Sequence, residues 1–205
     1  MKQLHKGIYV VVDSAQNLET MTRQLQQITG EAIAAVQIWD NPEAEQKLGA
    51  VVEKVLQIWE DSSVPVLINN KWEMLKEYAL DGVHFDALPA NWQDIWAQLP
   101  RNAITGLTLE NDLSVVEQDA PVDYYSFCSV FPSPTVTSCE IVRPETIVQC
   151  RKLTPKPLYL AGGINAQNLS ELRGLPFDGV AVISAVMNHP HPQQIVRELV
   201  AQLGD

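Results

Sequence analysis

The sequence has few cysteines, few basic residues and no long apolar run, and each shortage excludes a class of protein. Its three cysteines, Cys128, Cys139 and Cys150, fit neither a disulfide framework nor a zinc site, and we interpret them as reduced thiols. Lys and Arg number 14 against 25 Asp and Glu, so the formal net charge of −11 argues against a nucleic-acid or anionic-membrane partner. No apolar run approaches the ~20 residues that span a bilayer, and no signal peptide is recognisable. We therefore expect a cytoplasmic protein.

The sequence is rich in short apolar runs that alternate with longer segments of helical period. With 46% hydrophobic residues, the 205-residue chain can bury one core, and we expect a single domain over residues 1–205. Eight such strand and helix pairs predict an α/β fold, a closed (β/α)8 TIM barrel. The expected strands are Gly7–Val12, Ile33–Ile38, Pro65–Ile68, Gly82–Phe85, Ala103–Leu107, Val122–Phe127, Pro157–Leu160 and Asp178–Ile183. The expected helical segments are Leu18–Ile28, Pro42–Trp59, Lys71–Tyr78, Asn91–Leu99, Asn111–Glu117, Pro144–Leu153, Ala166–Leu172 and Pro192–Leu203.

A Gly-Gly pair follows the seventh expected strand, in the sequence "PLYLAGGINAQNL". Barrel enzymes place their chemistry on the loops after the strands, and the loops after strands seven and eight often hold a phosphate on backbone N–H groups. Gly162 and Gly163 therefore suggest a phosphate site, together with the run Val182 to Val186 after the eighth strand. The alternative is that Gly-Gly simply ends a strand tightly. This motif alone does not decide between the two.

Other residues near the expected strand ends each have two interpretations. Cys128 is either a nucleophile or a buried small apolar group, and the absence of a neighbouring base in the sequence favours the second. His84 suits either a general base or a hydrogen-bonded structural histidine. Trp39 either stacks on a flat heterocycle or packs on the rim of the barrel. His189 and His191 share no helix face, which favours a loop over a metal pair.

Ordered motifs across nearly the whole chain resemble the thiamine phosphate synthase family, which includes the related thiazole tautomerases. Each motif falls at an expected strand end, and together they follow the order of the family. The motifs are "AAVQIWDN" (34–41), "VLINN" (66–70), "DGVHF" (81–85), "ITGLTLEN" (104–111), "DYYSFCSVFPSPT" (123–135), "AGGINAQNL" (161–169) and "FDGVAVISAV" (177–186).

The resemblance implies an enzyme of thiamine biosynthesis. Such enzymes join an aminopyrimidine, carried as its diphosphate, to a thiazole phosphate with the help of Mg²⁺, and they release pyrophosphate. The implied partners are these two phosphorylated small molecules, with no nucleic acid and no membrane, and family barrels often form homodimers.

The resemblance also assigns site residues. Gln37, Asn69 and Thr108 match catalytic polar positions near the pyrimidine and the pyrophosphate. Trp39, Asn70 and His84 are candidate substrate contacts. The residues that match the phosphate-binding positions are Ser133, Thr135, Gly162, Gly163, Ile183 and Ser184.

The basic residues that the family uses around the pyrophosphate are replaced in this sequence. Trp39 and Asn41 stand where the family has an Arg and a Lys, and Val136 replaces a Lys after the sixth strand. Each such group typically contributes about 2 to 4 kcal/mol of transition-state stabilisation. Their loss predicts a weakened site for the leaving pyrophosphate.

The usual carboxylate ligands of Mg²⁺ are also replaced. Asn70 stands where the family has an Asp, and Pro89 stands at the position of its second acidic ligand. Asp86 and Asp94 lie nearby in the sequence, but neither falls in register. Because Mg²⁺ prefers carboxylate oxygens, we expect no metal site built from the family's ligands.

Three functions therefore remain open. The first is a thiamine phosphate synthase with an altered pyrophosphate site. The second is an isomerase or lyase related to the thiazole tautomerases, although Ser129 stands where that branch has a His. The third is a phosphate-ligand-binding relative without catalytic activity.

Overall fold

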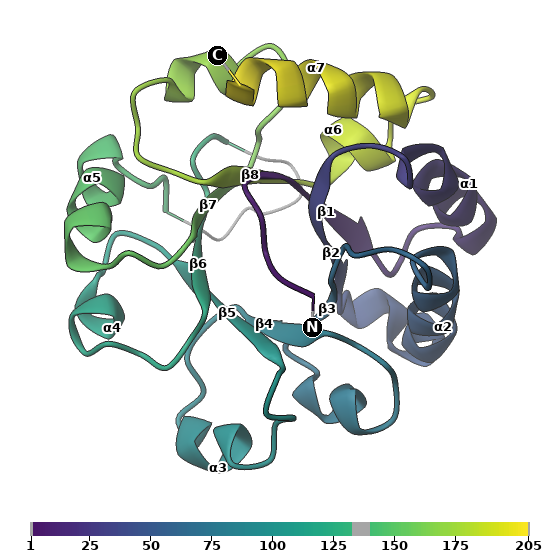
Figure 1. The fold of residues 1–205 in the computed structure, drawn as a ribbon, viewed down its shortest axis with the longest axis horizontal. Coiled ribbons are helices and arrows are strands. Elements are labelled where there is room, and N and C mark those ends of the chain that lie inside the picture. Colours follow the sequence, from purple (N-terminus) through teal and green to yellow (C-terminus); the bar gives the residue numbers. More distant parts are fainter. Residues whose placement is uncertain (1, 133–139, 205) are drawn as a thin grey trace.

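The computed structural model describes residues 2–132 and 140–204, which form a closed barrel of eight parallel strands surrounded by helices (Figure 1). Each strand pairs with the next along the chain, and β8 closes the ring against β1. The expected (β/α)8 barrel is therefore confirmed. The strands are β1 Gly7–Asp13, β2 Ile33–Trp39, β3 Val66–Asn69, β4 Gly82–Phe85, β5 Ile104–Leu109, β6 Tyr124–Cys128, β7 Leu158–Ala161 and β8 Gly179–Val182.

The helices differ more from the sequence prediction than the strands do. The expected helix over Pro42–Trp59 begins instead as a 3-10 segment, η1, that is kinked at Ala44 (φ −120°, ψ 16°), and the α-helix α2 starts at Leu48. Four expected helices shrink to single short turns, η2, α3, α4 and η3, and a short helix, α6, follows β8 without having been predicted. The helical elements are α1 Leu18–Ile28, η1 Pro42–Lys47, α2 Leu48–Ile58, η2 Trp72–Lys76, α3 Trp92–Trp96, α4 Ser114–Glu117, α5 Pro144–Leu153, η3 Leu169–Leu172, α6 Ser184–Met187 and α7 Pro192–Gly204.

The best-formed helices follow from local sequence. The Asn17 side chain caps α1 by accepting a hydrogen bond from the Thr20 N–H at 3.0 Å. Met21, Leu25 and Ile28 recur at helical spacing and are fully buried against the barrel. Pro144 lies in the first turn of α5, where its fixed φ suits a helix start.

Aromatic side chains fill the inside of the barrel. Tyr9, Tyr124 and Tyr159 are at most 2% exposed, and their ring centroids lie 5.4 to 6.0 Å apart. Gly106 and Gly179 make room for them, since a Cβ atom at either position would meet a tyrosine ring at 2.8 Å or less. A separate, larger apolar layer lies between the strands and the helices. The interior is thus a packed core in which tyrosines oppose glycines.

The N-terminal segment crosses the bottom of the barrel, at the N-terminal ends of the strands (Figure 1). Leu4 packs against the interior cluster, and the Tyr159 hydroxyl donates to the His5 carbonyl at 2.6 Å. Ion pairs of 3.2 Å join Lys2 to Asp81 and Lys6 to Asp178 on either side of the opening. This segment covers the floor, so the opposite end is the open mouth.

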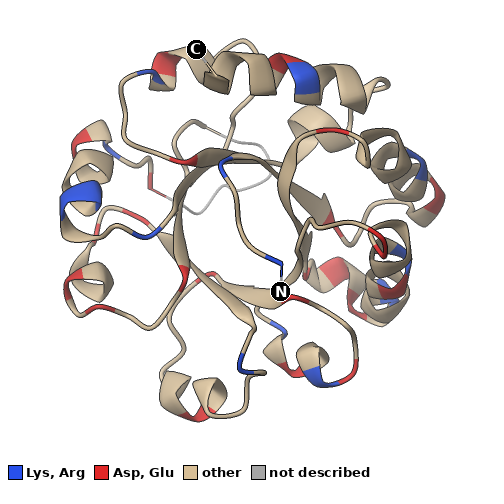
Figure 2. Ribbon diagram, viewed as in Figure 1, with Lys and Arg blue, Asp and Glu red and all other residues tan. Residues whose placement is uncertain are grey.

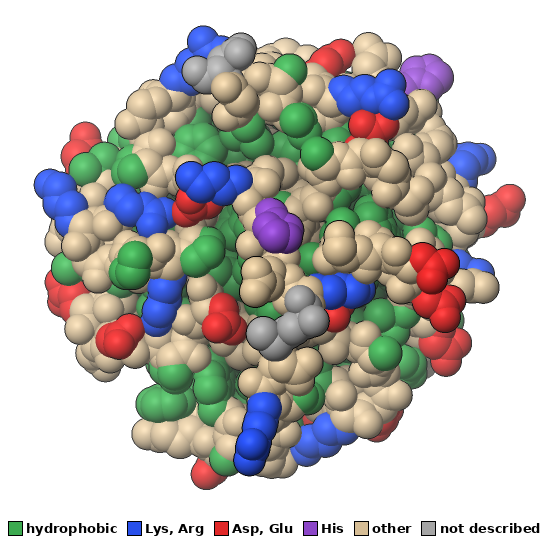
Figure 3. Space-filling view, in the orientation of Figure 1, with side chains coloured by type: hydrophobic (Ala, Val, Ile, Leu, Met, Phe, Trp, Pro, Cys, Tyr) green, Lys and Arg blue, Asp and Glu red, His purple; other side chains and the backbone are tan. Residues whose placement is uncertain are grey.

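Charged residues lie on the outer elements, and the strands carry few of them (Figure 2). On the face shown in Figure 3, Lys and Arg side chains are scattered among Asp and Glu and do not gather into one basic patch. Within residues 2–132 and 140–204, no helix is long and apolar enough to cross a membrane.

The fit of Tyr124 against Gly106 gives a test of the interior packing. A Cβ atom at position 106 would lie 2.1 Å from Tyr124 Cζ, so we expect Gly106→Ala to lower the free energy of unfolding by about 1–3 kcal/mol. Gly30→Ala is the matched control, because a Cβ atom there would meet nothing within 4 Å. Urea denaturation of both variants measures the difference. Equal stability would show that the tyrosine can move aside.

Candidate active site

Polar side chains gather at the mouth of the barrel, where β2 to β5 end. Gln37, Asn69 and His84 are at most 7% exposed, and Thr108 is half-buried. The Gln37 amide donates to Asn69 Oδ1. Parallel pairing places Asn69 directly beside His84 in neighbouring strands. The structure thus brings together the three residues that the resemblance assigned to catalysis and His84, which it gave as a candidate substrate contact.

Two carboxylates flank Asn69. Its Nδ2 atom donates to Asp40 Oδ1 at 3.1 Å and to Asp86 Oδ2 at 3.0 Å. Asn70 joins the group from a left-handed conformation (φ 52°), donating to Asp86 Oδ2 at 2.8 Å and accepting from the Asp86 N–H at 3.0 Å. Asn is one of the few residues that adopt this conformation readily. The loops after β2, β3 and β4 are therefore joined through carboxylates and amides.

The electrostatics of this pair favour a cation. Burial raises the pKa of the Asp40 carboxyl; the hydrogen bond from Asn69 lowers it, and the nearby Asp86 raises it. Lys71 also lowers the Asp40 pKa, but its ammonium group is engaged with Glu45 at 3.5 Å. A hard cation between the two carboxylates would relieve their repulsion.

Sequence reasoning identified only part of this acidic pair. The sequence places Asp86 near the second acidic position of the family but out of register with it, and in the structure Asp86 reaches the mouth. Asp94, the other residue noted, lies exposed on α3. Asp40 was missed, although an acidic residue directly after a strand is a recognisable signal in a barrel. Among the residues that the structure describes, no three His, Cys, Asp or Glu side chains form a group that could hold a metal ion.

The positions of the missing family cations now have other roles. Asn41 Nδ2 donates to Asp13 Oδ1 at 2.9 Å, the Asn41 N–H donates to Ser14 Oγ at 3.1 Å, and the Asn41 side chain caps η1. Asn41 therefore braces the first two loops of the mouth. Trp39 is half-buried and packs against the interior aromatic cluster.

A hydrogen-bonded histidine lies beneath the mouth. His84 Nδ1 is 2.9 Å from the Tyr124 hydroxyl, and His84 Nε2 is 2.8 Å from Thr108 Oγ1. Burial lowers the pKa of His84 to about 4, against a raising effect of Asp86. The ring is therefore neutral near pH 7, and both of its nitrogens already have partners inside the protein.

The turn after β7 that contains Gly162 and Gly163, called here the glycine corner, lies across the mouth. Gly162 (φ 91°) and Gly163 (φ 67°) are left-handed, and a Cβ atom on either would overlap Ser129 or Pro132. The side-chain amides of Asn165 and Asn168 hold the Gly163 carbonyl at 3.2 and 2.9 Å. The glycines therefore have a packing role, whatever ligand they meet.

A cavity of about 380 Å³ opens beside this corner. Gly162, Gly163, Ile183 and Ser184 line it, together with Cys128. Ser184 is exposed at the start of α6. Four of the expected phosphate-binding residues thus share one cavity, while Ser133, Thr135 and Val136 lie outside the described residues.

The remaining candidates are the cysteines and two histidines. Cys128 and Cys150 are reduced thiols, and Cys139 lies outside the described residues. The His191 N–H donates to His189 Nδ1 at 3.1 Å in the loop before α7. This contact belongs to a turn, in agreement with the loop interpretation.

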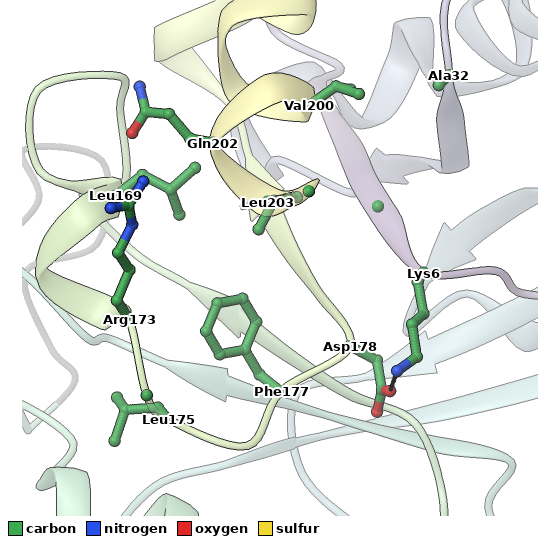
Figure 4. A pocket seen from close by; sticks show the side chains of 13 residues that line it. Lys6, Ala32, Leu169, Arg173, Leu175, Phe177, Asp178, Val200, Gln202 and Leu203 are labelled. Atoms are coloured by element: carbon green, nitrogen blue, oxygen red, sulfur yellow. Dashed lines mark ion pairs between the residues drawn. The ribbon is translucent and has the colours of Figure 1, made fainter.

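A larger cavity, of about 500 Å³, lies at the opposite end of the barrel (Figure 4). It is bordered by Leu175, Phe177, Leu203 and the ion pair between Lys6 and Asp178. In Figure 4 Phe177 lies in the middle of this space, below the C-terminal end of α7. Because barrel chemistry belongs to the C-terminal ends of the strands, we assign this cavity to packing.

Comparison with known proteins decides the family. Residues 8–186 match the family described as thiamine monophosphate synthase. The chain belongs to this family. The resemblance inferred from the ordered motifs is confirmed.

Relatives of this thiamine monophosphate synthase family member match over nearly their whole length. The chain is 26% identical to thiamine-phosphate synthase of Vibrio campbellii over 193 residues, which cover 91% of this chain and 92% of the relative. It is 27% identical to thiamine-phosphate synthase of Halorhodospira halophila, covering 96% and 93%. The thiamine phosphate pyrophosphorylase structure from Pyrococcus furiosus superposes with a TM-score of 0.79 at 20% identity, covering 97% and 95%, and shows the same fold.

The buried His84 predicts a pH dependence of stability. Its folded pKa of about 4 lies below the usual 6.5, so the unfolded chain gains the proton first as the pH falls. The stability contributed by the neutral ring is complete above about pH 6.5 and is lost towards pH 4, by up to about 3 kcal/mol. Urea denaturation across this window should show a smaller loss for His84→Gln than for the wild type. His191→Gln, in an exposed loop, should behave as the wild type; equal slopes for wild type and His84→Gln would contradict a buried neutral ring.

Proposed function

We propose that the protein is a thiamine-phosphate synthase, a transferase of thiamine biosynthesis that joins an aminopyrimidine diphosphate to a thiazole phosphate and releases pyrophosphate. The observation that carries this proposal is the mouth of a family barrel with a glycine-lined cavity on one side and buried amides and carboxylates on the other. Both sequence relatives and the structural neighbour bear names of this activity.

The glycine corner would hold the thiazole phosphate. Gly162 and Gly163 leave the backbone accessible, and Ser184 offers a hydroxyl and an N–H group at the start of α6. Such groups bind an anion without adding net charge. Ser133 and Thr135 join this set on the strength of the family motif.

The amide side of the mouth would hold the pyrimidine and the diphosphate. Gln37, Asn69 and Thr108 present polar atoms in a buried setting, where hydrogen bonds orient a ligand strongly. Asn70 holds Asp86 by donating to its carboxylate and by accepting from its backbone N–H. Trp39, at the rim, supplies a flat apolar surface beside these groups.

The residues present fit Mg²⁺, although they are not the ligands expected from the family. Asp40 and Asp86 would hold the ion, since Mg²⁺ is usually bound by one or two carboxylates together with substrate phosphates and water. When bound, Mg²⁺ would neutralise charge on the departing pyrophosphate. Asn69 and Asn70 would keep both carboxylates in place, as they already contact them.

A second candidate is a phosphate-ligand-binding protein without transferase activity. It is favoured by Trp39 and Asn41, which occupy the positions of two family cations and are fixed by packing and by loop hydrogen bonds. A thiazole tautomerase-like isomerase would instead release a product from thiazole phosphate alone. A homodimer and a cytoplasmic location are part of the proposal by analogy with the family.

The direct test is thiamine phosphate formation by the purified protein, supplied with both substrates and Mg²⁺ and followed by chromatography. We expect turnover, with Asp86→Asn and Asp40→Asn each lowering kcat/KM by about 10²-fold. Asp94→Asn, on the exposed face of α3, is the matched control and should match the wild type. Folded protein that binds thiazole phosphate but forms no product would support the binding protein instead.

A substitution at Gly162 or Gly163 cannot test phosphate binding cleanly, because a side chain there would also disturb packing against Ser129 and Pro132. Ser184→Ala removes one hydroxyl from the exposed start of α6. We expect it to raise KM for thiazole phosphate by about 5- to 10-fold through a lost hydrogen bond, with little change in kcat. Ser170→Ala, exposed on η3, is the control. An unchanged KM would remove Ser184 from the phosphate site.

A further inference from the structure

A continuous line of hydrogen bonds runs through the barrel, from the carboxylates of the mouth to Thr108. Its first part joins Asp40 and Asp86 to Asn69, and Asn69 to Gln37. Its second part joins the Gln37 amide to the hydroxyl of Tyr9 at 2.8 Å. The contacts involve strands far apart in sequence, so only the closed barrel assembles them.

The line continues across the interior. Tyr9 and Tyr124 hydroxyl oxygens lie 2.8 Å apart, Tyr124 lies 2.9 Å from His84 Nδ1, and His84 Nε2 lies 2.8 Å from Thr108 Oγ1. Tyr9, Tyr124 and His84 are 2%, 0% and 4% exposed, so water does not compete for these groups. Each hydroxyl and each amide must therefore form its hydrogen bonds with the adjacent groups of the line.

The carboxylates determine the direction of the first hydrogen bonds. An ionised carboxylate only accepts, so the Asn69 amide must present its N–H₂ group to Asp40 and Asp86. The carbonyl oxygen of Asn69 then accepts from the Gln37 N–H₂ group. The carbonyl of Gln37 is left to accept from the Tyr9 hydroxyl.

The same logic fixes the remaining protons. Since the Tyr9 proton is used on Gln37, the Tyr9 oxygen accepts from Tyr124. The Tyr124 oxygen then accepts from His84 Nδ1, which must carry the ring proton. The Nε2 atom of a neutral ring is an acceptor, so the Thr108 hydroxyl donates to it.

We propose that Asp40 and Asp86 impose this single direction on the whole line, so that His84 carries its proton on Nδ1 and Thr108 offers only lone pairs to the mouth. Tyr9, Tyr124 and His84 are then positioning residues. Thr108 selects a ligand with an N–H donor over one with an oxo group at the same place. The identity of that ligand as an aminopyrimidine rests on the proposed function.

Reversal of the line is disfavoured at its charged end. It would turn the Asn69 carbonyl oxygen towards two carboxylates, placing three acceptors together without a proton between them. Unsatisfied polar groups of this kind cost about 1–3 kcal/mol each when buried. The direction is thus a consequence of charge at the mouth.

The first test is nitrogen NMR of the ligand-free protein, because the protonated and unprotonated nitrogens of a neutral imidazole resonate at well-separated positions. We expect the His84 proton on Nδ1 at neutral pH. In Tyr9→Phe, Tyr124 loses its acceptor and can donate to His84, so the proton should move to Nε2. Tyr159→Phe is the matched control: its ring packs in the same cluster, but its hydroxyl bonds to the His5 carbonyl, so the Nδ1 form should persist.

An Nε2 proton in the wild type, or no change in Tyr9→Phe, would overturn the proposal. Both readings come from the free protein, so they do not depend on any assumed substrate.

The second test compares binding of an aminopyrimidine with that of the pyrimidinone in which an oxo group replaces the amino group, by calorimetry. We expect at least 10-fold preference for the amino compound, kept in Thr108→Ser and lost in Thr108→Val. Preference for the pyrimidinone, or a preference that Thr108→Val retains, would overturn the selection step. Binding of neither compound, with the Nδ1 form observed, would refute the proposed function and leave the directed line standing.

Discussion

The packing of three tyrosine rings inside a closed ring of strands is the constraint on which the rest of the structure depends. Tyr9, Tyr124 and Tyr159 fill a space that Gly106 and Gly179 leave open. A buried hydroxyl must also find a partner. The Tyr159 hydroxyl finds it at the floor, while those of Tyr9 and Tyr124 find Gln37 and His84 towards the mouth. The core that stabilises the barrel therefore also orients its polar site.

The mouth of this barrel differs in charge from the pattern expected of its family. Acidic and amide groups stand around Asn69, and the positions of two family cations are taken by Trp39 and Asn41. In compensation, Asp40 and Asp86 come from the ends of β2 and β4 and form a pair that Asn70 helps to hold. Under the proposed function, Asp40 and Asp86 would supply the carboxylates for a cation and a diphosphate in place of the residues that the family resemblance implies.

Sequence patterns predicted the strands closely because a strand buried on both faces leaves a continuous apolar run with polar or glycine ends. The short helical turns were less predictable, since tertiary contacts such as those of Asn111 with Ile141 and Arg143 replace helical hydrogen bonds. Asp40 directly follows a strand, which is a recognisable signal, but no local pattern predicts that Asn69 joins it to Asp86, 46 residues away in the sequence. Likewise, nothing local connects His84 with Tyr124. Motif matching predicted positions that lie at the mouth, but not the partners that hold them.

The segment that crosses the floor of the barrel has a practical consequence. Lys2 and Lys6 anchor it to opposite sides of the opening, and its backbone accepts a hydrogen bond from Tyr159. The mouth lies at the other end of the strands. A biosensor surface that captures the chain through this segment would hold every molecule with its mouth turned to the solution, and so would suit kinetic measurements with small phosphorylated analytes.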